Sequence, residues 1–138
     1  MSRSKRILIA LGLMLGVALV ATEAQATTSV CRGEAPAVGA QIRGPVLYVI
    51  DGGRLCVALE PSPSTWVELQ VLDPRVVRTS SADDAKQRLM AAAFARDAVC
   101  VITGTSAGRA TAACMIEGEQ LSARVSQPEI AKAAQIWR

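Results

Sequence analysis

The sequence predicts an α+β fold that is mainly β: an OB-type five-stranded barrel with one helix between the third and fourth strands and short C-terminal helices. Three apolar segments separated by turn residues come first, then one amphipathic segment, then two apolar segments around a glycine-containing loop. This order suits a small closed barrel of the OB type. A chain of 138 residues is long enough for one small domain with its own core and too short for two.

Residues 1–26 have the pattern of a secretory signal peptide. Three basic side chains precede an apolar run from Ile7 to Ala21, and Ala24-Gln25-Ala26 follows as a small-x-small cleavage site. The alternative is an uncleaved anchor, but this run of 15 residues is shorter than the roughly 20 that a spanning helix needs. We therefore expect cleavage after Ala26, a mature chain without a membrane span, and a periplasmic or secreted location.

The mature chain begins with an extended lead-in over residues 27–44, and the barrel domain follows over 45–138. The lead-in is rich in Gly, Ala, Pro and Thr and has no sustained hydrophobic period. Val46–Ile50 is apolar and β-branched and runs into Asp51-Gly52-Gly53, which predicts a strand that ends in a tight turn. Leu55–Leu59 is the second predicted strand.

A third strand and a helix follow. Trp66–Leu72 alternates polar and apolar residues, as a half-buried strand does. Ser80 and Ser81 precede Asp83 and Asp84, so a serine N-cap is followed by acidic residues in the first turn, where the helix dipole favours them. Apolar residues at i, i+3 and i+4 spacing extend this helix to about Arg96.

The C-terminal part is predicted to hold two more strands and short helices. Val99–Thr103 and Ala110–Ile116 are apolar segments on either side of a glycine-containing loop. A helical turn is expected over Leu121–Val125. Pro128 suits the first turn of a last helix that runs towards Ile136 and Trp137.

Four cysteines, an even number, lie in the mature part of the chain, which indicates disulfides in an exported protein. Four cysteines allow three pairings. A hairpin folded around residue 107 would place Cys100 opposite Cys114, so we favour Cys100–Cys114 together with Cys31–Cys56. Four buried thiols are the alternative. A zinc site is disfavoured because the chain has neither a CxxC spacing nor a histidine.

Composition excludes several classes of function. Without histidine, Ser-His-Asp and Cys-His nucleophile pairs, HExxH zinc sites and imidazole proton shuttles cannot form. The formal charge of +3 belongs mostly to the leader, because residues 27–138 hold 12 basic and 11 acidic side chains. A nearly neutral domain attracts phosphate backbones only weakly, and four aromatic residues are few for a base-stacking platform. We therefore do not expect nucleic acid as a partner.

From Gly44 to Val125 the order of elements, the Asp51-Gly52-Gly53 turn and the Gly108-Arg109 pair resemble the staphylococcal-nuclease-like (thermonuclease) family. The resemblance implies an OB-type barrel with packed helices. It also implies calcium-dependent phosphodiester hydrolysis, in which carboxylates hold the ion, a glutamate handles the attacking water and two arginines neutralise the phosphate.

The family's metal ligands are largely missing from this chain. Asp51 matches the first aspartate of the family's turn, but the second aspartate is replaced by Gly53. Asp73 is a second residual metal position only if it coincides with the family's remaining ligand carboxylate. The alternative for Asp51 is local, because an aspartate before Gly-Gly commonly caps its own turn.

The family's catalytic groups are also replaced. Its strand-three arginine falls on Gln70 in one register and on Glu68 in another, and its catalytic glutamate falls on Arg78 or near Arg75. Only Arg109 is retained, and the alternative for Arg109 is a solvated residue beside a hairpin turn. Losing one preorganised charged group typically costs about 10²–10³ in rate, so three losses should abolish hydrolysis.

We therefore expect a non-catalytic exported domain with a binding or structural role. No catalytic residue, metal ligand or cofactor is expected, and the partner is an unknown protein, peptide or glycan. The alternative is a calcium-dependent nuclease with relocated catalytic residues, in which several carboxylates would converge on one calcium ion.

Overall fold

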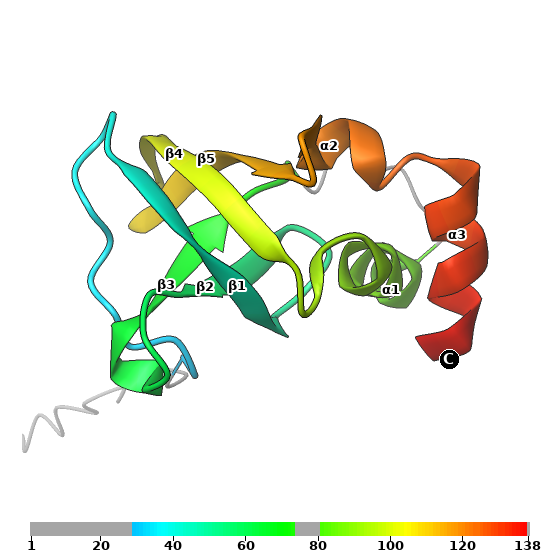
Figure 1. Ribbon diagram of the computed structural model, residues 1–138, viewed down its shortest axis with the longest axis horizontal. Helices are drawn as coiled ribbons and strands as arrows, with labels where there is room; N and C mark the ends of the chain where they lie inside the picture. The colour runs from blue at the N-terminus through cyan, green and yellow to red at the C-terminus, as the bar shows by residue number, and fades with distance from the viewer. Residues whose placement is uncertain (1–28, 74–80, 138) are drawn as a thin grey trace, which may run out of the picture.

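The computed structural model describes residues 29–73 and 81–137 (Figure 1). Its strands are β1 (Gln41–Val49), β2 (Arg54–Ala58), β3 (Trp66–Gln70), β4 (Asp97–Ser106), β5 (Arg109–Ile116) and β6 (Glu119–Gln120). Its helices are α1 (Ala82–Ala93), α2 (Leu121–Arg124) and α3 (Pro128–Ala134), with 3-10 turns η1 (Pro63–Thr65) and η2 (Gln135–Trp137). The predicted signal peptide lies outside these described residues.

The strands form a closed barrel of the predicted OB type. They are hydrogen-bonded in the order β3-β2-β1-β4-β5-β6, and a parallel pairing of Gln70 with Thr111 joins β3 to β5. This pairing closes a ring of five strands, and β6 lies outside the ring as a short extension beside β5. The mainly β fold class predicted from the sequence is confirmed.

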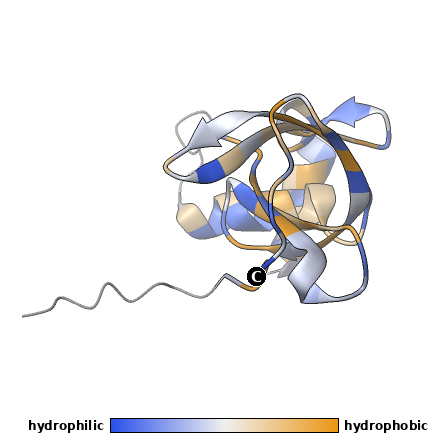
Figure 2. Ribbon diagram, turned by 90° about the vertical axis from the view of Figure 1, so that its left-hand side faces the viewer, coloured by the Kyte–Doolittle hydropathy of each residue, from blue (hydrophilic) through white to orange (hydrophobic). Residues whose placement is uncertain are grey.

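The barrel core is built from residues that alternate along the strands. Val67 and Leu69 of β3 are buried, whereas their neighbours Trp66, Glu68 and Gln70 are only partly buried. Figure 2 shows hydrophobic and hydrophilic residues mixed along the strands of the barrel. Leu89, Ala92 and Ala93 of α1 join the same core.

The helices lie together at one end of the barrel (Figure 1). The Ser81 hydroxyl accepts a hydrogen bond from the Asp84 amide and so caps α1, as predicted. The helix ends at Ala93, three residues before the predicted end, because Phe94 has extended ψ and Ala95 has a positive φ of 60°. The buried Arg124 of α2 donates from Nε to the Ala92 carbonyl at 2.9 Å and thereby satisfies a carbonyl near this end.

Strand β1 begins at Gln41, five residues earlier than the sequence predicted. Its first half pairs with β4 from Gln41↔Val101 to Pro45↔Asp97. Gly44 permits this path, since a Cβ at that position would overlap the carbonyl oxygen of Ala58. The Gly44-Pro45 pair therefore lies inside a strand, where close packing requires the glycine.

All four cysteines are disulfide-bonded in the pairing that the sequence favoured. Cys100 and Cys114 are directly opposite each other on β4 and β5, with a Cα–Cα distance of 4.1 Å. Cys31 and Cys56, with a Cα–Cα distance of 5.9 Å, join the N-terminal segment to β2. Two disulfides are compatible with an oxidising location. Within the described ranges, no helix is both long and apolar enough to cross a membrane.

Candidate functional site

The Asp51 carboxylate caps the turn between β1 and β2. Its Oδ1 accepts hydrogen bonds from the backbone amides of Gly53 and Arg54, each at 2.9 Å. This is an Asx turn, the local alternative considered for this aspartate. The second carboxylate oxygen, Oδ2, accepts from Nε of the Arg54 side chain at 2.7 Å.

Arg54 lies between two carboxylates. Besides its bond to Asp51, it donates from a terminal nitrogen to Oε1 of Glu68 at 3.1 Å. The two residues approach because β2 and β3 are antiparallel with Arg54 opposite Gln70 and Cys56 opposite Glu68, so Arg54 and Glu68 are diagonal neighbours on one face.

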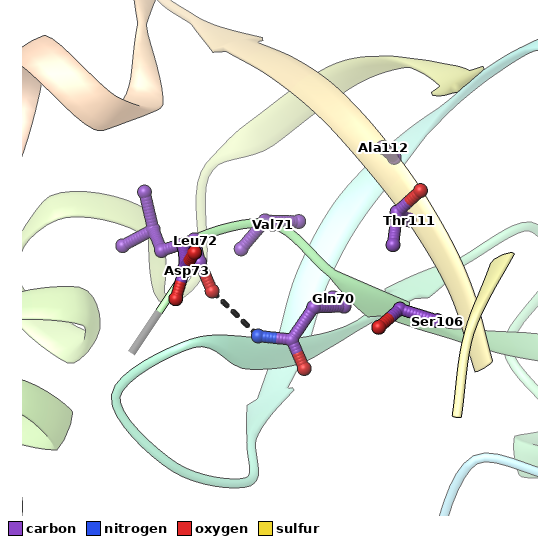
Figure 3. Close-up of a pocket in the computed structure, with 7 residues that line it drawn as sticks. All are labelled: Gln70, Val71, Leu72, Asp73, Ser106, Thr111 and Ala112. Atoms are coloured by element: carbon purple, nitrogen blue, oxygen red, sulfur yellow. Dashed lines mark hydrogen bonds between the residues drawn. The ribbon is translucent and has the colours of Figure 1, made fainter. Parts of the chain in front are cut away.

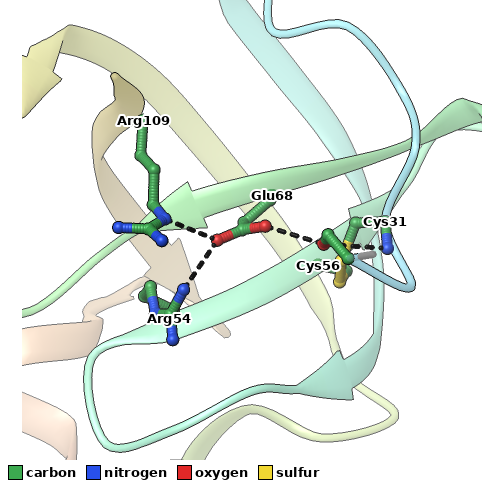
Figure 4. Close-up of a disulfide and its surroundings, with 6 residues drawn as sticks. Cys31, Arg54, Cys56, Glu68 and Arg109 are labelled. Carbon is green, nitrogen blue, oxygen red and sulfur yellow. Dashed lines mark hydrogen bonds and ion pairs between the residues drawn. A yellow bond between two sulfur atoms is a disulfide. The ribbon is translucent and has the colours of Figure 1, made fainter. Parts of the chain in front are cut away.

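Glu68 is the centre of the charged cluster (Figure 4). Its Oε1 also forms an ion pair with Nε of Arg109 at 3.2 Å, so two guanidinium groups meet on one oxygen. Its Oε2 accepts a hydrogen bond from the Ser29 hydroxyl at 2.7 Å. The Glu68 side chain is only 17 % exposed, whereas that of Arg109 is 46 % exposed.

We call Asp51, Arg54, Glu68 and Arg109 the charge cluster. It brings together two sequence-predicted positions, Asp51 and Arg109, which are joined through Arg54 and Glu68 and not by direct contact. Two carboxylates balance two guanidinium groups, so the cluster carries no net charge when all four are ionised. Arg54 and Ser29 had no signal in the sequence, because their contacts depend on the strand register and on the path of the N-terminal segment.

The cluster shifts the acidity of its members. Burial alone would raise the pKa of Asp51, but hydrogen bonds from the Gly53 amide and from Arg54, together with the Arg54 charge, bring it below its ordinary value. The hydrogen bond to Asp51 raises the pKa of Arg54, which partial burial alone would lower. Both residues are therefore held in their charged forms.

Gly53 lies in close contact with the end of β3. A Cβ at this position would be 2.6 Å from the Gln70 side-chain nitrogen and 2.6 Å from the Leu72 carbonyl oxygen. The Gln70 amide occupies this space because it donates to the carbonyls of Gly53, at 3.3 Å, and of Leu72, at 2.5 Å. The second glycine of the Asp51-Gly52-Gly53 turn is therefore closely packed.

Asp73, which the resemblance would make a metal position only if it coincides with the family's remaining ligand, lines a cavity of about 600 Å³ between the end of β3 and strand β5 (Figure 3). The other lining residues are Gln70, Val71, Leu72, Ser106, Thr111 and Ala112. No member of the charge cluster is among them.

The chemistry available at the cluster follows from these contacts. Both carboxylates already accept hydrogen bonds from arginine, and both arginines already face a carboxylate. In the described part of the chain, no group of three or more His, Cys, Asp or Glu side chains could hold a metal ion. Arg75 and Arg78, the positions considered for the family's glutamate, lie outside that part.

Comparison of the chain with known protein families, with curated proteins and with solved structures gave no match.

Proposed function

We propose that this chain is an exported, non-catalytic domain of the staphylococcal-nuclease type, with a binding role for its barrel surface. The resemblance in element order, in the Asp51-Gly52 turn and in Gly108-Arg109 supports the family. The charge cluster supports the absence of catalysis. The partner class is a protein, peptide or glycan.

The observation that carries the proposal is the position of the Glu68 carboxylate. It accepts from Arg54 and pairs with Arg109, the one catalytic group that the resemblance retains. In the family such an arginine neutralises the phosphate undergoing attack. Here a carboxylate from the same chain takes the place of that anion, so a phosphodiester would have to displace it and meet its repulsion.

The calcium side of the reaction is weakened in the same region. Calcium takes about 6–8 oxygen ligands, and its affinity follows the number of charged ligands. Gly53 supplies no side-chain oxygen, and Asp51 accepts three hydrogen bonds from its own turn. These contacts favour a site that neither binds calcium nor activates water.

The proposed location is the periplasm or the extracellular space. The signal-peptide pattern of residues 1–26 supports it, and so do the two disulfides, since disulfides persist in oxidising compartments.

Calcium titration by calorimetry, paired with cleavage assays on DNA and RNA, tests the proposal. We expect no heat beyond dilution at millimolar calcium and no cleavage by the purified mature protein. An authentic thermonuclease in the same buffers is the positive control. Calcium-dependent cleavage that is lost in Arg109→Ala would overturn the proposal and favour a nuclease with relocated residues.

The role of Glu68 is tested by Glu68→Gln. The substitution removes the charge that satisfies Arg54 and Arg109, so we expect inorganic sulfate to bind the variant at least tenfold more tightly than the unchanged protein. The readout is the sulfate-dependent rise in the melting temperature. Glu60→Gln, in the exposed loop after β2, is the matched control and should respond as the unchanged protein does. Equal sulfate responses from all three proteins would contradict this role.

A further inference from the structure

The outer face of β2 and β3 is covered by the chain's own N-terminal segment. Cys56 is directly opposite Glu68, and paired residues in an antiparallel sheet point to the same side. Leu55 and Val57 point into the core, so Cys56 points away from it. Cys56 is nevertheless fully buried, because the segment Ser29–Gly33 lies over it and Cys31 is bonded to it (Figure 4).

This segment packs on the barrel with a bend at Val30, where the Ser29 hydroxyl accepts a hydrogen bond from the Cys31 amide at 3.3 Å. Its residues alternate: Ser29, Cys31 and Gly33 are at least partly buried, whereas Val30 and Arg32 are exposed. The Arg32 amide donates to the Pro63 carbonyl at 3.1 Å, and the Gly33 amide donates to the Trp66 carbonyl at 2.8 Å. Gly33 also forms a parallel bridge with Val67, so the segment extends the sheet at the edge of β3.

Each inward residue makes a contact that only certain side chains can make. The Ser29 hydroxyl donates to Glu68. Cys31 is a small residue over the buried Cys56. A Cβ at Gly33 would be 2.7 Å from the Trp66 carbonyl oxygen and 2.8 Å from the Thr65 carbonyl carbon, so no larger residue fits there. This face therefore favours a peptide with a hydroxyl side chain, a small residue and a glycine at alternate positions, as in Ser29, Cys31 and Gly33.

We propose that the outer face of β2 and β3, with the edge of β3 that Gly33 pairs with, is a binding site for a short peptide, and that Ser29–Gly33 is its resident ligand. The partner is a segment of another polypeptide with the same pattern that takes the conformation of Ser29–Gly33. Main-chain hydrogen bonds supply affinity that is independent of side chains. The Glu68 carboxylate favours a hydroxyl donor and repels phosphate, so the contacts favour peptide over nucleic acid.

This inference rests on the proposed binding role, for which it names the class of partner. The peptide-binding experiment tests the partner class, and the calcium and cleavage assays test the absence of catalysis, so either proposal can be overturned without the other. Cleavage of DNA by the same protein would overturn the absence of catalysis without changing how peptides bind.

Capture of a synthetic peptide by Cys56 tests the site. In Cys31→Ser the full N-terminal segment remains but is no longer tethered, and Cys56 is a free thiol. The probe is the peptide Ser-Val-Cys-Arg-Gly-Glu-Ala-Pro, residues 29–36, supplied as its mixed disulfide with 2-mercaptoethanol. The Cys56 thiolate attacks the peptide sulfur and releases 2-mercaptoethanol, and mass spectrometry in excess 2-mercaptoethanol gives the labelled fraction.

The matched control is the same peptide with valine in place of its glycine. We expect the unchanged peptide to label Cys56 at least tenfold more at equilibrium, because the valine side chain would overlap the Trp66 carbonyl. An alanine in place of the peptide's serine should lower labelling several-fold, since the bond to Glu68 is lost. Equal labelling by the glycine and valine peptides, or no labelling by either, would overturn the proposal.

Two further measurements are controls, one for non-specific labelling of any free thiol and one for unfolding of the Cys31→Ser protein. In Cys114→Ser the free Cys100 should not distinguish the two peptides, because its disulfide partner Cys114 lies on the neighbouring strand β5 and not on a segment with the pattern of Ser29–Gly33. If circular dichroism shows that Cys31→Ser is unfolded, the peptides are compared on the unchanged protein in the same thiol buffer, where they compete with its own Cys31. The same preference for glycine is expected, and its absence would overturn the proposal.

Discussion

At the scale of single residues, acidic side chains of this barrel act on their own chain. Asp51 accepts hydrogen bonds from two amides and one guanidinium group. Glu68 accepts hydrogen bonds from Arg54 and Ser29 and forms an ion pair with Arg109. A carboxylate in such contacts must give up charge-assisted hydrogen bonds before it can bind a metal ion. The same residue types that form hydrolytic sites elsewhere therefore stabilise a turn and a pair of strands here.

The lowered pKa of Asp51 predicts a pH dependence of stability. A carboxyl group whose pKa is lower in the folded state than in the unfolded chain stabilises the fold above its ordinary pKa, here 3.8. That stabilisation is lost as the pH falls through the lower folded value. We expect Asp51→Asn to lower the free energy of unfolding at pH 7 by less than about 1 kcal/mol, since the side chain is half exposed.

Urea denaturation from pH 7 down to pH 2.5 checks this dependence. The free energies of unfolding of the unchanged protein and of Asp51→Asn should begin to converge as the pH falls below 3.8, and should meet once the pH is below the lower pKa of the folded carboxyl group. A difference between the two proteins that stays constant down to the lowest pH would contradict the account.

At the scale of elements, the sequence predicted best the strands that turn residues or polar residues delimit. The bounds of β2, β3 and β5 differ from the predicted ones by no more than two residues. Burial alternates along β3 and β5, whereas β2 is a short apolar run that is almost wholly buried between two turns. The start of β1 was not predicted, since Gly44-Pro45 resembles a strand end in sequence. Only the packing against Ala58 explains the glycine there. The two-residue strand β6 is too short to have a pattern of its own.

Only the local contacts of the candidate site could be predicted from the sequence. The turn-capping role of Asp51 is local in sequence and was among the alternatives considered for it. The ion pairs of Glu68 join residues on three strands, and their geometry depends on register and barrel closure. The single residue at which β3 meets β5, Gln70, is two positions from Glu68, which places Arg109 within reach.

Arg124 connects two of the helical elements and allows a test at this scale. Its Nε bonds to the Ala92 carbonyl at the end of α1, and a terminal nitrogen lies 3.3 Å from both Glu117 and Glu119. We expect Arg124→Ala to lower the free energy of unfolding by about 2 kcal/mol, because a buried carbonyl loses a charged donor. Chemical denaturation measures this free energy of unfolding. Arg124→Lys should recover part of the lost stability, and an Arg124→Ala protein as stable as the unchanged one would contradict this role.

At the scale of the whole molecule, the two disulfides have different positions relative to barrel closure. Cys100–Cys114 lies within one hairpin and spans 14 positions, whereas Cys31–Cys56 spans 25 and holds a segment from outside the barrel. Loop-closure entropy assigns each about 3 kcal/mol of stabilisation of the oxidised protein. The barrel is therefore suited to a compartment in which thiols are oxidised.

If the protein is exported, we expect it to begin at one residue after signal cleavage and to have all four cysteines oxidised. When the full chain is expressed in a bacterium with a periplasm, we expect the recovered protein to begin at Thr27, because Ala24-Gln25-Ala26 is the cleavage pattern. Intact-mass measurement after alkylation should find no free thiol. A protein that begins at Met1 in the membrane fraction, or that takes up four alkyl groups, would contradict the prediction.

The close packing of Gly53 limits which residues the turn between β1 and β2 accepts. A side chain at position 53 would meet the Gln70 amide, which can rotate away, and the Leu72 carbonyl oxygen, which belongs to the backbone. A larger residue there has to displace the end of β3 as well as Gln70, so this turn tolerates less sequence change than most loops do.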